Sequence, residues 1–233
     1  MKIVGLVQAR MGSSRLPGKV MEVIEDKPLI GHIFGRLKKV SKLDNIILAT
    51  TLDERNNSLE EYAITENILV YRHKEENDII GRLVNAAKLS KADAILKINA
   101  DCPLIDPISM NKLVDIYINA PIKPDIATNK INYTFPDGYG LELINYKTLM
   151  WCNNNIKDKY NRELIVQWII NNPNKFIRIS MENDINYSSY GLCVDTQEDL
   201  IYIKNIFKLL YKKNNYFGLN EVINLIEKKE INI

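Results

Sequence analysis

The chain alternates between short apolar runs and longer stretches in which apolar residues recur every three or four positions. Four apolar runs have the length of buried strands: 3–7, 45–50, 68–71 and 93–99. Leu29, Ile33 and Leu37 have helical spacing, as do the apolar residues of 79–90. Strand and helix therefore alternate along the chain. This order predicts an α/β fold with a mostly parallel sheet covered by helices on both faces.

The same pattern continues to the end of the chain with shorter elements. Helices are expected at 29–40, up to 66, 79–90, 108–119, 145–153 and 159–170, after Asp195 and around Val222. Extended segments are expected at 19–24, 125–128, 133–135, 141–144, 176–180 and 191–194. Pro136-Asp137-Gly138 predicts a turn, because Pro presets its φ and Gly accepts a positive one. Without an internal repeat or linker, residues 1–233 are expected to form a single domain.

The richest chemistry follows the first apolar run, in IVGLVQARMGSSRLPGKV at 3–20. The glycines of this loop let backbone N–H groups approach an anion closely, and its serines add hydroxyl donors. Arg10, Arg15 and Lys19 can neutralise a polyphosphate. The stretch therefore predicts a strand that ends in a phosphate-binding loop, with a solvated basic turn as the alternative.

Two well-known phosphate motifs do not fit this loop. A P-loop has four residues between its glycines and a hydroxyl residue after its lysine, whereas Gly12 and Gly18 are one residue too far apart and Val20 follows Lys19. Pro17 also removes one N–H donor from the loop. The G-x-G-x-x-G fingerprint of dinucleotide-binding domains is absent as well, which disfavours a dehydrogenase.

Asp101 is the second candidate for chemistry, because it follows the strand at 93–99. A carboxylate at a strand end, facing a triphosphate, suits magnesium, a hard cation that takes oxygen ligands. Asp106 fits a different role, as the cap of the helix that follows it, and Asp78 is expected to cap the helix at 79–90. Thr196 and Asp199 have the spacing of a capping box at a later helix start.

Composition narrows the class of protein and its partners. The formal net charge is +2 and basic residues are scattered among nearly as many acids, so nucleic acid is not expected as a partner. The three cysteines lie far apart without a C-x-x-C pair, and they suggest neither a disulfide framework nor a zinc site. No apolar run is long enough for a signal peptide or a membrane span. We therefore expect a cytoplasmic protein without a membrane partner.

Three motifs together resemble a known family. The run QARMGSSRLPGKV, the heptapeptide DCPLIDP at 101–107 and VDTQED at 194–199 are similar to the cytidylyltransferases that activate acidic sugars. The spore-coat polysaccharide branch is the most similar, and the synthetases of CMP-linked keto-deoxy-octulosonate and acylneuraminate are more distant. The resemblance covers nearly the whole chain. It implies a Rossmann-like nucleotide-diphospho-sugar transferase fold with a small extended insertion, CTP as substrate, Mg²⁺ as cofactor and a homodimer.

The resemblance also assigns roles to residues at matching positions. Arg15, Lys19 and Asp101 are implied to be catalytic, and Asp101 and Asp195 to hold the metal. The implied nucleotide-binding residues are Gln8, Ala9, Arg10, Gly12, Ser13, Ser14, Arg15, Lys19, Arg72, Asp78, Arg82 and Asn99. The implied acceptor-binding residues are Asp137, Glu142, Arg162 and Glu163.

Several residues depart from the family pattern. His73 and Lys74 stand where Gly and Ser are usual in the loop that selects the base, and Leu164 replaces a usual His. His73 is expected to be an exposed loop residue and not a catalytic base, because the sequence places no carboxylate beside it. The acceptor pocket is thus expected to differ from that of relatives.

The function implied is transfer of CMP from CTP to an acidic sugar or similar acceptor, with release of pyrophosphate, for cell-surface glycan biosynthesis. Two alternatives remain. One is a sugar-phosphate nucleotidyltransferase that uses another nucleotide, and the other is a catalytically silent nucleotide-binding protein.

Overall fold

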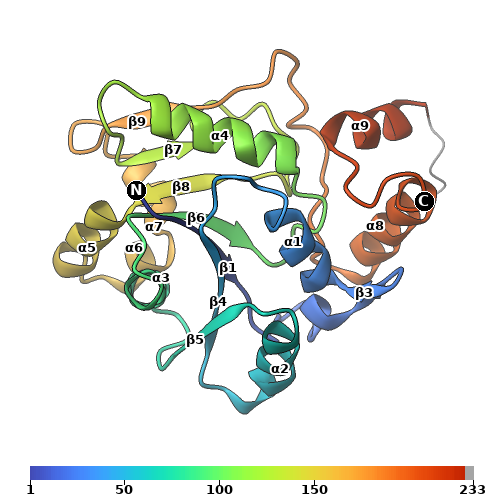
Figure 1. The fold of residues 1–233 in the computed structure, drawn as a ribbon, viewed down its shortest axis with the longest axis horizontal. Helices are drawn as coiled ribbons and strands as arrows, with labels where there is room; N and C mark the ends of the chain where they lie inside the picture. Colours follow the sequence, from blue (N-terminus) through green and yellow to red (C-terminus); the bar gives the residue numbers. More distant parts are fainter. Residues whose placement is uncertain (229–233) are drawn as a thin grey trace.

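Seven strands form one twisted sheet in a computed structural model of the chain, which describes residues 1–228 (Figure 1). Their order across the sheet is β5-β4-β1-β6-β8-β7-β9. The strands are β1 (Ile3–Gln8), β4 (Asn45–Thr51), β5 (Leu69–His73), β6 (Ala94–Asn99), β7 (Ile126–Thr128), β8 (Glu142–Asn145) and β9 (Arg178–Ser180). A separate hairpin pairs β2 (Val23–Ile24) with β3 (Lys27–Pro28). Residues 229–233, which the expected single domain includes, lie outside the described residues.

The topology places a ligand-binding edge next to β1. This strand pairs in parallel with β4 on one side and with β6 on the other, and β4 pairs in parallel with β5. After β1 the chain forms β4 and β5 on one side of that strand, and it then crosses to form β6 on the other side. This reversal of strand order opens a crevice at the carboxyl ends of β1 and β6. Strand β8 runs antiparallel to both β6 and β7, so the sheet is mostly parallel, as the sequence predicted.

Helices cover both faces of the sheet (Figure 1). They are α1 (Leu29–Leu37), α2 (Asn57–Thr65), α3 (Ile79–Leu89), α4 (Pro107–Asn119), α5 (Tyr146–Asn155), α6 (Lys159–Glu163), α7 (Ile165–Ile170), α8 (Gln197–Leu210) and α9 (Leu219–Glu227). One buried apolar cluster joins the sheet to α1, α2, α4, α8 and α9, and a second joins its other face to α3, α5 and α7. Side chains of β1 alternate between the two clusters, as the period of a strand requires.

The predicted helix caps are present. The Asp78 carboxylate accepts from the Gly81 N–H at 3.1 Å, and Asp106 accepts from the N–H groups of Ile108 and Ser109. Thr196 and Asp199 form the expected capping box at the start of α8. These contacts satisfy N–H groups that the first turn of a helix leaves without partners.

The predicted turn at 136–138 is also present, and it depends on Gly138. This residue has φ +95°, and a Cβ built there would lie 2.5 Å from the carbonyl oxygen of Leu192. The Tyr139 N–H closes the turn on the Pro136 carbonyl at 3.1 Å. Both the positive φ and the close approach of another backbone segment therefore require glycine.

Some boundaries differ from the sequence prediction. The helix expected at 159–170 breaks into α6 and α7 at Leu164, whose ψ of +38° lies outside the helical range. The segments at 133–135 and 191–194 are not strands, because one isolated bridge between Asp137 and Gly191 is too little for a ladder. Lys19–Met21 forms a short 3₁₀ turn where an extended piece was expected.

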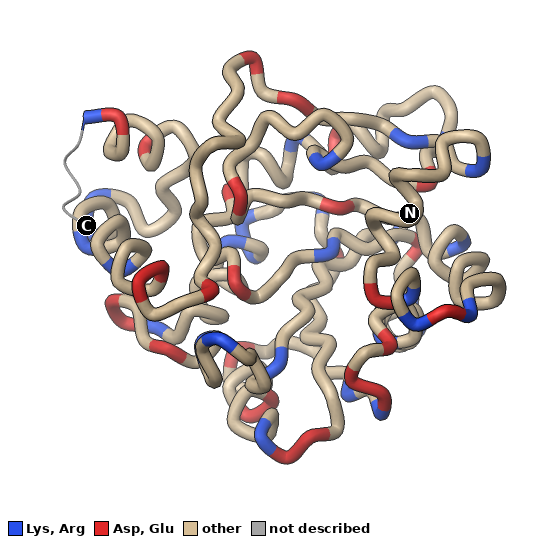
Figure 2. The backbone as a smooth tube through the Cα atoms, turned by 180° about the vertical axis from the view of Figure 1, so that it is seen from behind, with Lys and Arg blue, Asp and Glu red and all other residues tan. Residues whose placement is uncertain are grey.

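Charged residues of both signs are interspersed along the backbone in Figure 2. Among residues 1–228, no helix has the length and apolar character that crossing a membrane would require.

Candidate active site

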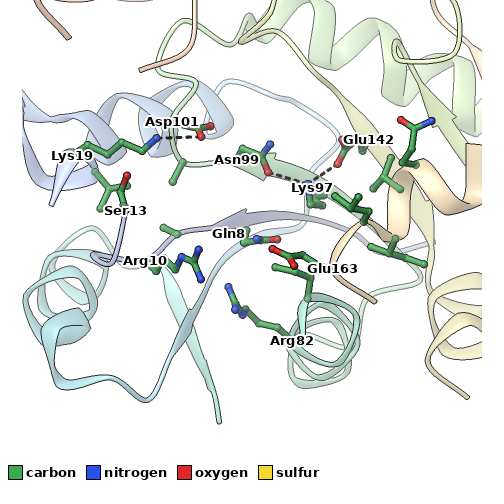
Figure 3. Close-up of a pocket in the computed structure, with 18 of the residues that line it drawn as sticks. Gln8, Arg10, Ser13, Lys19, Arg82, Lys97, Asn99, Asp101, Glu142 and Glu163 are labelled. Atoms are coloured by element: carbon green, nitrogen blue, oxygen red, sulfur yellow. Dashed lines mark hydrogen bonds and ion pairs between the residues drawn. The ribbon is translucent and has the colours of Figure 1, made fainter. Parts of the chain in front are cut away.

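A cavity of about 520 Å³ opens at the carboxyl ends of β1 and β6 (Figure 3). Its walls come from the loop after β1, the end of β6, the first turn of α3, strand β8 and the junction of α6 with α7. These segments are distant in the sequence. They meet because the order in which strands are added to the sheet reverses at β1.

The loop after β1 is folded back on itself. The Met11 carbonyl accepts from the N–H groups of Ser13 and Gly18, at 3.0 and 2.9 Å, and Gly18 has φ +75°. The Met11 N–H in turn donates to the Asn56 side chain at 2.8 Å, which ties the loop to the start of α2. This fold presents five side chains of the loop to the cavity: Arg10, Ser13, Ser14, Arg15 and Lys19.

Lys19 joins the loop to two carboxylates. Its buried ammonium lies 2.9 Å from Asp195 Oδ1 and 3.4 Å from Asp101 Oδ2, and it donates to the Val194 carbonyl at 2.6 Å. Arg15 reaches the other oxygen of Asp195 at 2.9 Å. Figure 3 shows Lys19 and Asp101 joined at one end of the cavity. Asp101 and Asp195 thus converge on one positive charge, although they lie far apart in the sequence.

Asp195 is held in place by the capping box of α8. Its backbone N–H donates to the Asp199 carboxylate at 3.0 Å, and Asp101 accepts from the Val194 N–H at 2.9 Å through its backbone carbonyl. Both aspartates therefore sit on backbone that is fixed by hydrogen bonds. A pair of carboxylates that already surrounds a cation is a donor set that fits magnesium.

Unpaired polar atoms line the middle of the cavity. The Gln8 side-chain oxygen and the Arg82 Nε are buried and have no hydrogen-bond partner among the described residues. Burial lowers the pKa of the Arg82 guanidinium, which donates to the Glu76 carbonyl. Figure 3 shows Gln8, Arg82 and Glu163 grouped around the same space. An unpaired acceptor and an unpaired donor in the lining of one cavity favour a polar ligand there.

A buried triad of charges forms the far wall. Glu142 Oε2 accepts from Lys97 and its Oε1 lies against Lys130, each at 2.7 Å, while Lys97 also donates to Asn99 at 2.9 Å. Burial alone would raise the pKa of Glu142, but the two ammonium groups hold it at about 2. The triad therefore carries one excess positive charge at the cavity wall.

Most residues that the sequence assigned to the site line this cavity. They are Gln8, Ala9, Arg10, Ser13, Ser14, Arg15, Lys19, Arg82, Asn99, Asp101, Glu142 and Glu163. Their binding and catalytic roles stay predictions. Asp195 is not part of the lining, but it forms ion pairs with two lining residues, Lys19 and Arg15.

Gly12, Arg72 and Asp137 lie outside the cavity lining. Gly12 packs against the guanidinium of Arg55. The Arg72 guanidinium is occupied by Glu60, at 2.7 Å, and by protein oxygens around the start of α2. Asp137 sits in the turn, where its side chain accepts from its neighbour Gly138.

Asp78 and Arg162 bind each other instead of lining the cavity. The Arg162 Nε donates to Asp78 Oδ1 at 2.9 Å, and its other nitrogens reach the Ile156 carbonyl and the Asn153 side chain. This fork ties α6 to the start of α3. Glu163 and Leu164, the next two residues, then face the cavity.

His73 differs from its prediction. It ends β5, its side chain is only 12% exposed, and its Nε2 lies 3.3 Å from Asp78 Oδ2. The Tyr71 hydroxyl contacts its other ring nitrogen at 3.2 Å. The expected exposed loop residue is therefore half-buried beside a carboxylate, because the turn into α3 folds Asp78 back over the strand end.

Lys97 and Lys130 are cavity residues that sequence reasoning missed. One signal was available for Lys97, since a lysine within the apolar strand AILKIN must find a partner when both faces of the sheet are covered. Its partner comes from the register of the sheet, which pairs Lys97 directly with Glu142. Lys130 carries no comparable signal.

Comparison with known proteins points to one family. A family model described as cytidylyltransferase matches residues 4–223. An uncharacterised protein of Methanocaldococcus jannaschii is 31% identical over 98% of this chain and 91% of its own. The spore coat polysaccharide biosynthesis protein SpsF of Bacillus subtilis is 27% identical over 97% and 94% of the two chains. A solved cytidylyltransferase structure from Leptospira borgpetersenii is 31% identical, with a TM-score of 0.93 over 99% of this chain and 95% of that one.

Proposed function

We infer that this chain, which belongs to the cytidylyltransferase family, transfers CMP from CTP to an acidic sugar and releases pyrophosphate for glycan biosynthesis. One observation carries the assignment of the reacting end of the cavity. Lys19 of the phosphate loop lies within 3.4 Å of Asp101 and 2.9 Å of Asp195. A triphosphate bound by the loop therefore has its reacting part next to the acidic pair.

The reaction forms one bond and breaks another at the α-phosphorus of CTP. An acceptor oxygen attacks, and the bond to the bridging oxygen breaks so that its electron pair leaves with pyrophosphate. Arg15 and Lys19, which line the cavity, neutralise the charge that grows on the leaving group. No covalent intermediate with the protein is needed, so positioning and charge neutralisation carry the catalysis.

Asp101 and Asp195 would hold magnesium in this reaction. The ion, when bound, would neutralise charge on the phosphate oxygens and orient the α-phosphate. The convergence of both carboxylates on the Lys19 ammonium supports this assignment. Arg15 would then contact the second Asp195 oxygen and the phosphates at the same time.

The nucleoside end of CTP is assigned to the middle of the cavity. The unpaired Gln8 oxygen and Arg82 Nε offer an acceptor and a donor to a base. Arg10 is paired with Glu76 at 2.6 Å, and both side chains are partly exposed. Arg10 can therefore exchange this partner for a phosphate at little cost.

The acceptor is assigned to the wall made by β8 and the junction of α6 with α7. The excess positive charge of Lys97, Glu142 and Lys130 supports an acceptor that carries a carboxylate. Glu163 lines the same wall, and its carboxylate has no hydrogen-bond or ion-pair partner among residues 1–228. We propose that it accepts the proton of the attacking hydroxyl.

Pyrophosphate release tests the proposal. The purified chain with Mg²⁺ is offered each of the four nucleoside triphosphates, together with a panel of eight- and nine-carbon keto sugar acids and sugar phosphates. We expect release that depends on CTP and on a sugar acid. Release with another nucleotide and a sugar phosphate would replace this function with the related one, and CTP binding without release across the panel would indicate a silent nucleotide-binding protein.

Two further properties stay predictions, the first implied by the family resemblance and the second by the composition of the chain. The chain is proposed to work as a homodimer in the cytoplasm. Light scattering of the purified protein tests the first, and a monomer would contradict it. Fractionation of cells into cytosol and membranes tests the second.

A further inference from the structure

Two of the three cysteines lie together beside Asp101. The Sγ atoms of Cys102 and Cys193 are 3.6 Å apart, and Cys102 Sγ lies 3.2 Å from Asp101 Oδ1. One ligand atom from each of the three residues lies within 4.8 Å of the other two. Cys102 belongs to the loop after β6, whereas Cys193 precedes α8. The hydrogen bond from the Val194 N–H to the Asp101 carbonyl holds the two segments together at 2.9 Å.

We propose that Asp101, Cys102 and Cys193 form a binding site for a thiol-seeking divalent cation, and that Zn²⁺ is the ion it fits. Zinc binds thiolate sulfur at about 2.3 Å and carboxylate oxygen at about 2.0–2.2 Å in a tetrahedron. In such a tetrahedron two sulfur ligands lie about 3.8 Å apart, and a sulfur and an oxygen about 3.6 Å apart. The observed 3.6 and 3.2 Å are within a few tenths of an ångström of these spacings.

The same spacing argues against a disulfide as the resting state of this pair. A disulfide bond is about 2.05 Å long, so the two sulfur atoms would have to approach each other by about 1.5 Å. Coordination of zinc needs far less movement. The thiols are also in a hydrogen-bonded chain, since Cys102 donates to Asp101 and can accept from Cys193.

Charge balance makes the site suitable for a dication. Without metal the cluster holds one ionised carboxylate and two thiols. Zinc replaces the two thiol protons, which leave to solvent, and the bound cluster again carries one negative charge. Binding therefore adds no net charge to a partly buried site. The Asp101 side chain is 30% exposed and lines the cavity, which gives the ion a path inward.

The site is coupled to catalysis through the two oxygens of Asp101. Oδ2 faces Lys19, whereas Oδ1 faces the Cys102 thiol. A zinc ion on the thiol side would draw Asp101 away from the position proposed for magnesium. We therefore expect Zn²⁺ to inhibit CMP transfer, a consequence that rests on the proposed function, whereas the binding of zinc does not.

Zinc binding to the reduced chain tests the site directly. The metal-free protein competes with a chromophoric chelator for added ZnCl₂, and Co²⁺ is added separately to look for a thiolate-to-cobalt absorption band. We expect one tight ion per chain and that band. Cys193→Ser should weaken zinc binding at least about 100-fold, since loss of supporting groups alone costs 10- to 100-fold. Cys152→Ser should bind as the wild type does.

Cys152 is a matched control because it is buried on α5, in the apolar cluster on the other face of the sheet. Cys193→Ala and thermal unfolding of each variant show whether the fold is kept. Equal zinc affinity of wild type and a folded Cys193 variant would overturn the site. An equal loss in Cys152→Ser would overturn it as well.

Inhibition is then measured as pyrophosphate release at fixed Mg²⁺ and buffered Zn²⁺. Zinc should inhibit the wild type and leave folded Cys193→Ser unaffected. Equal inhibition of both would contradict the coupling to Asp101. Tight zinc binding with no pyrophosphate release under any condition would leave the site standing and remove the proposed function.

Discussion

Lys19 Nζ lies 2.9 Å from Asp195 Oδ1, so the loop after β1 is tied to the start of α8. The same ammonium is 3.4 Å from Asp101 and only 9% of its side chain is exposed. The Lys19 ammonium is therefore the positive charge between the two carboxylates when no ligand is bound. A magnesium ion at the two aspartates and a triphosphate in the cavity would both bind next to this ammonium.

Lys19→Gln is expected to separate metal binding from turnover. Loss of the cation should lower kcat/KM for CTP by about 10²- to 10³-fold, because a charge aimed at the leaving group is missing. The same change should raise the affinity for divalent metal in the absence of nucleotide, because a competing positive charge is gone. Steady-state kinetics and Mn²⁺ titration measure the two effects.

Lys204→Gln provides the control for this prediction, since Lys204 forms an exposed ion pair with Glu22 at 3.5 Å. Both readouts should stay unchanged in it. Wild-type turnover in Lys19→Gln would remove Lys19 from the catalytic set.

Asp101→Asn and Asp106→Ala should have opposite signatures, although the two aspartates stand in one heptapeptide. Asp101→Asn removes a proposed metal ligand and should abolish measurable turnover while the unfolding temperature stays near that of the wild type. Asp106→Ala removes the cap of α4 and should cost about 1–2 kcal/mol of stability with turnover retained. Thermal unfolding and pyrophosphate release on both proteins check this. Near-normal activity of Asp101→Asn would contradict the assignment of Asp101 as a metal ligand.

Glu142 should make stability depend on pH in the acid range. Burial opposes its ionisation, but Lys97 and Lys130 hold its pKa at about 2, below its ordinary 4.5. The folded state therefore gains stability from the ionised group above pH 4.5 and loses it as the pH falls toward 2. The amount is at most about 3 kcal/mol, from 1.36 kcal/mol per pKa unit.

Comparison with Glu142→Gln isolates this contribution. At pH 7 the variant should be about 3–5 kcal/mol less stable, because the buried Lys97 ammonium and the partly buried Lys130 ammonium lose their partner. Urea unfolding should show that this difference shrinks between pH 5 and pH 3. The control is Glu163→Gln, whose carboxylate has no ion-pair partner among the described residues. If the difference in unfolding free energy between wild type and Glu142→Gln stayed constant with pH, the proposed charge interaction of Glu142 with Lys97 and Lys130 would be wrong.

Arg162 is predicted to position the acceptor wall without contacting the acceptor. Its guanidinium binds Asp78, Asn153 and the Ile156 carbonyl, contacts that one lysine ammonium cannot reproduce. Arg162→Lys should lower the unfolding temperature and raise the acceptor KM more than the CTP KM, because Glu163 and Leu164 shift with α6. A raised acceptor KM with unchanged stability would instead indicate direct contact with the acceptor.

The parts that sequence reasoning predicted well are local. The folded loop after β1, the caps at Asp78 and Asp106, and the capping box of Thr196 are each encoded within a few consecutive residues. Their geometry follows from the hydrogen bonds that a strand end or a helix start leaves open. Most of the strands were found for a similar reason, since covering both faces of a parallel sheet requires an apolar run.

The contacts that sequence reasoning did not predict share a different cause. Sequence reasoning placed no carboxylate beside His73, and the family resemblance implied an acceptor contact for Arg162. In the structure both side chains bind Asp78. Arg72 and Arg82 looked equivalent as candidates, yet only Arg82 lines the cavity. Which groups become partners depends on how helices pack over the sheet. A pattern of spacings within one segment carries no information on this.

The sequence by itself determined that this chain builds an α/β sheet with a cationic loop after its first strand and acidic residues after later ones. Only the tertiary structure decided which of these groups meet. The register of β6 against β8 pairs Lys97 with Glu142, and the packing of α8 brings Asp195 to Lys19 and Cys193 to Cys102. The physical reason is that charges and thiols interact over a few ångströms in space, whatever their separation along the chain.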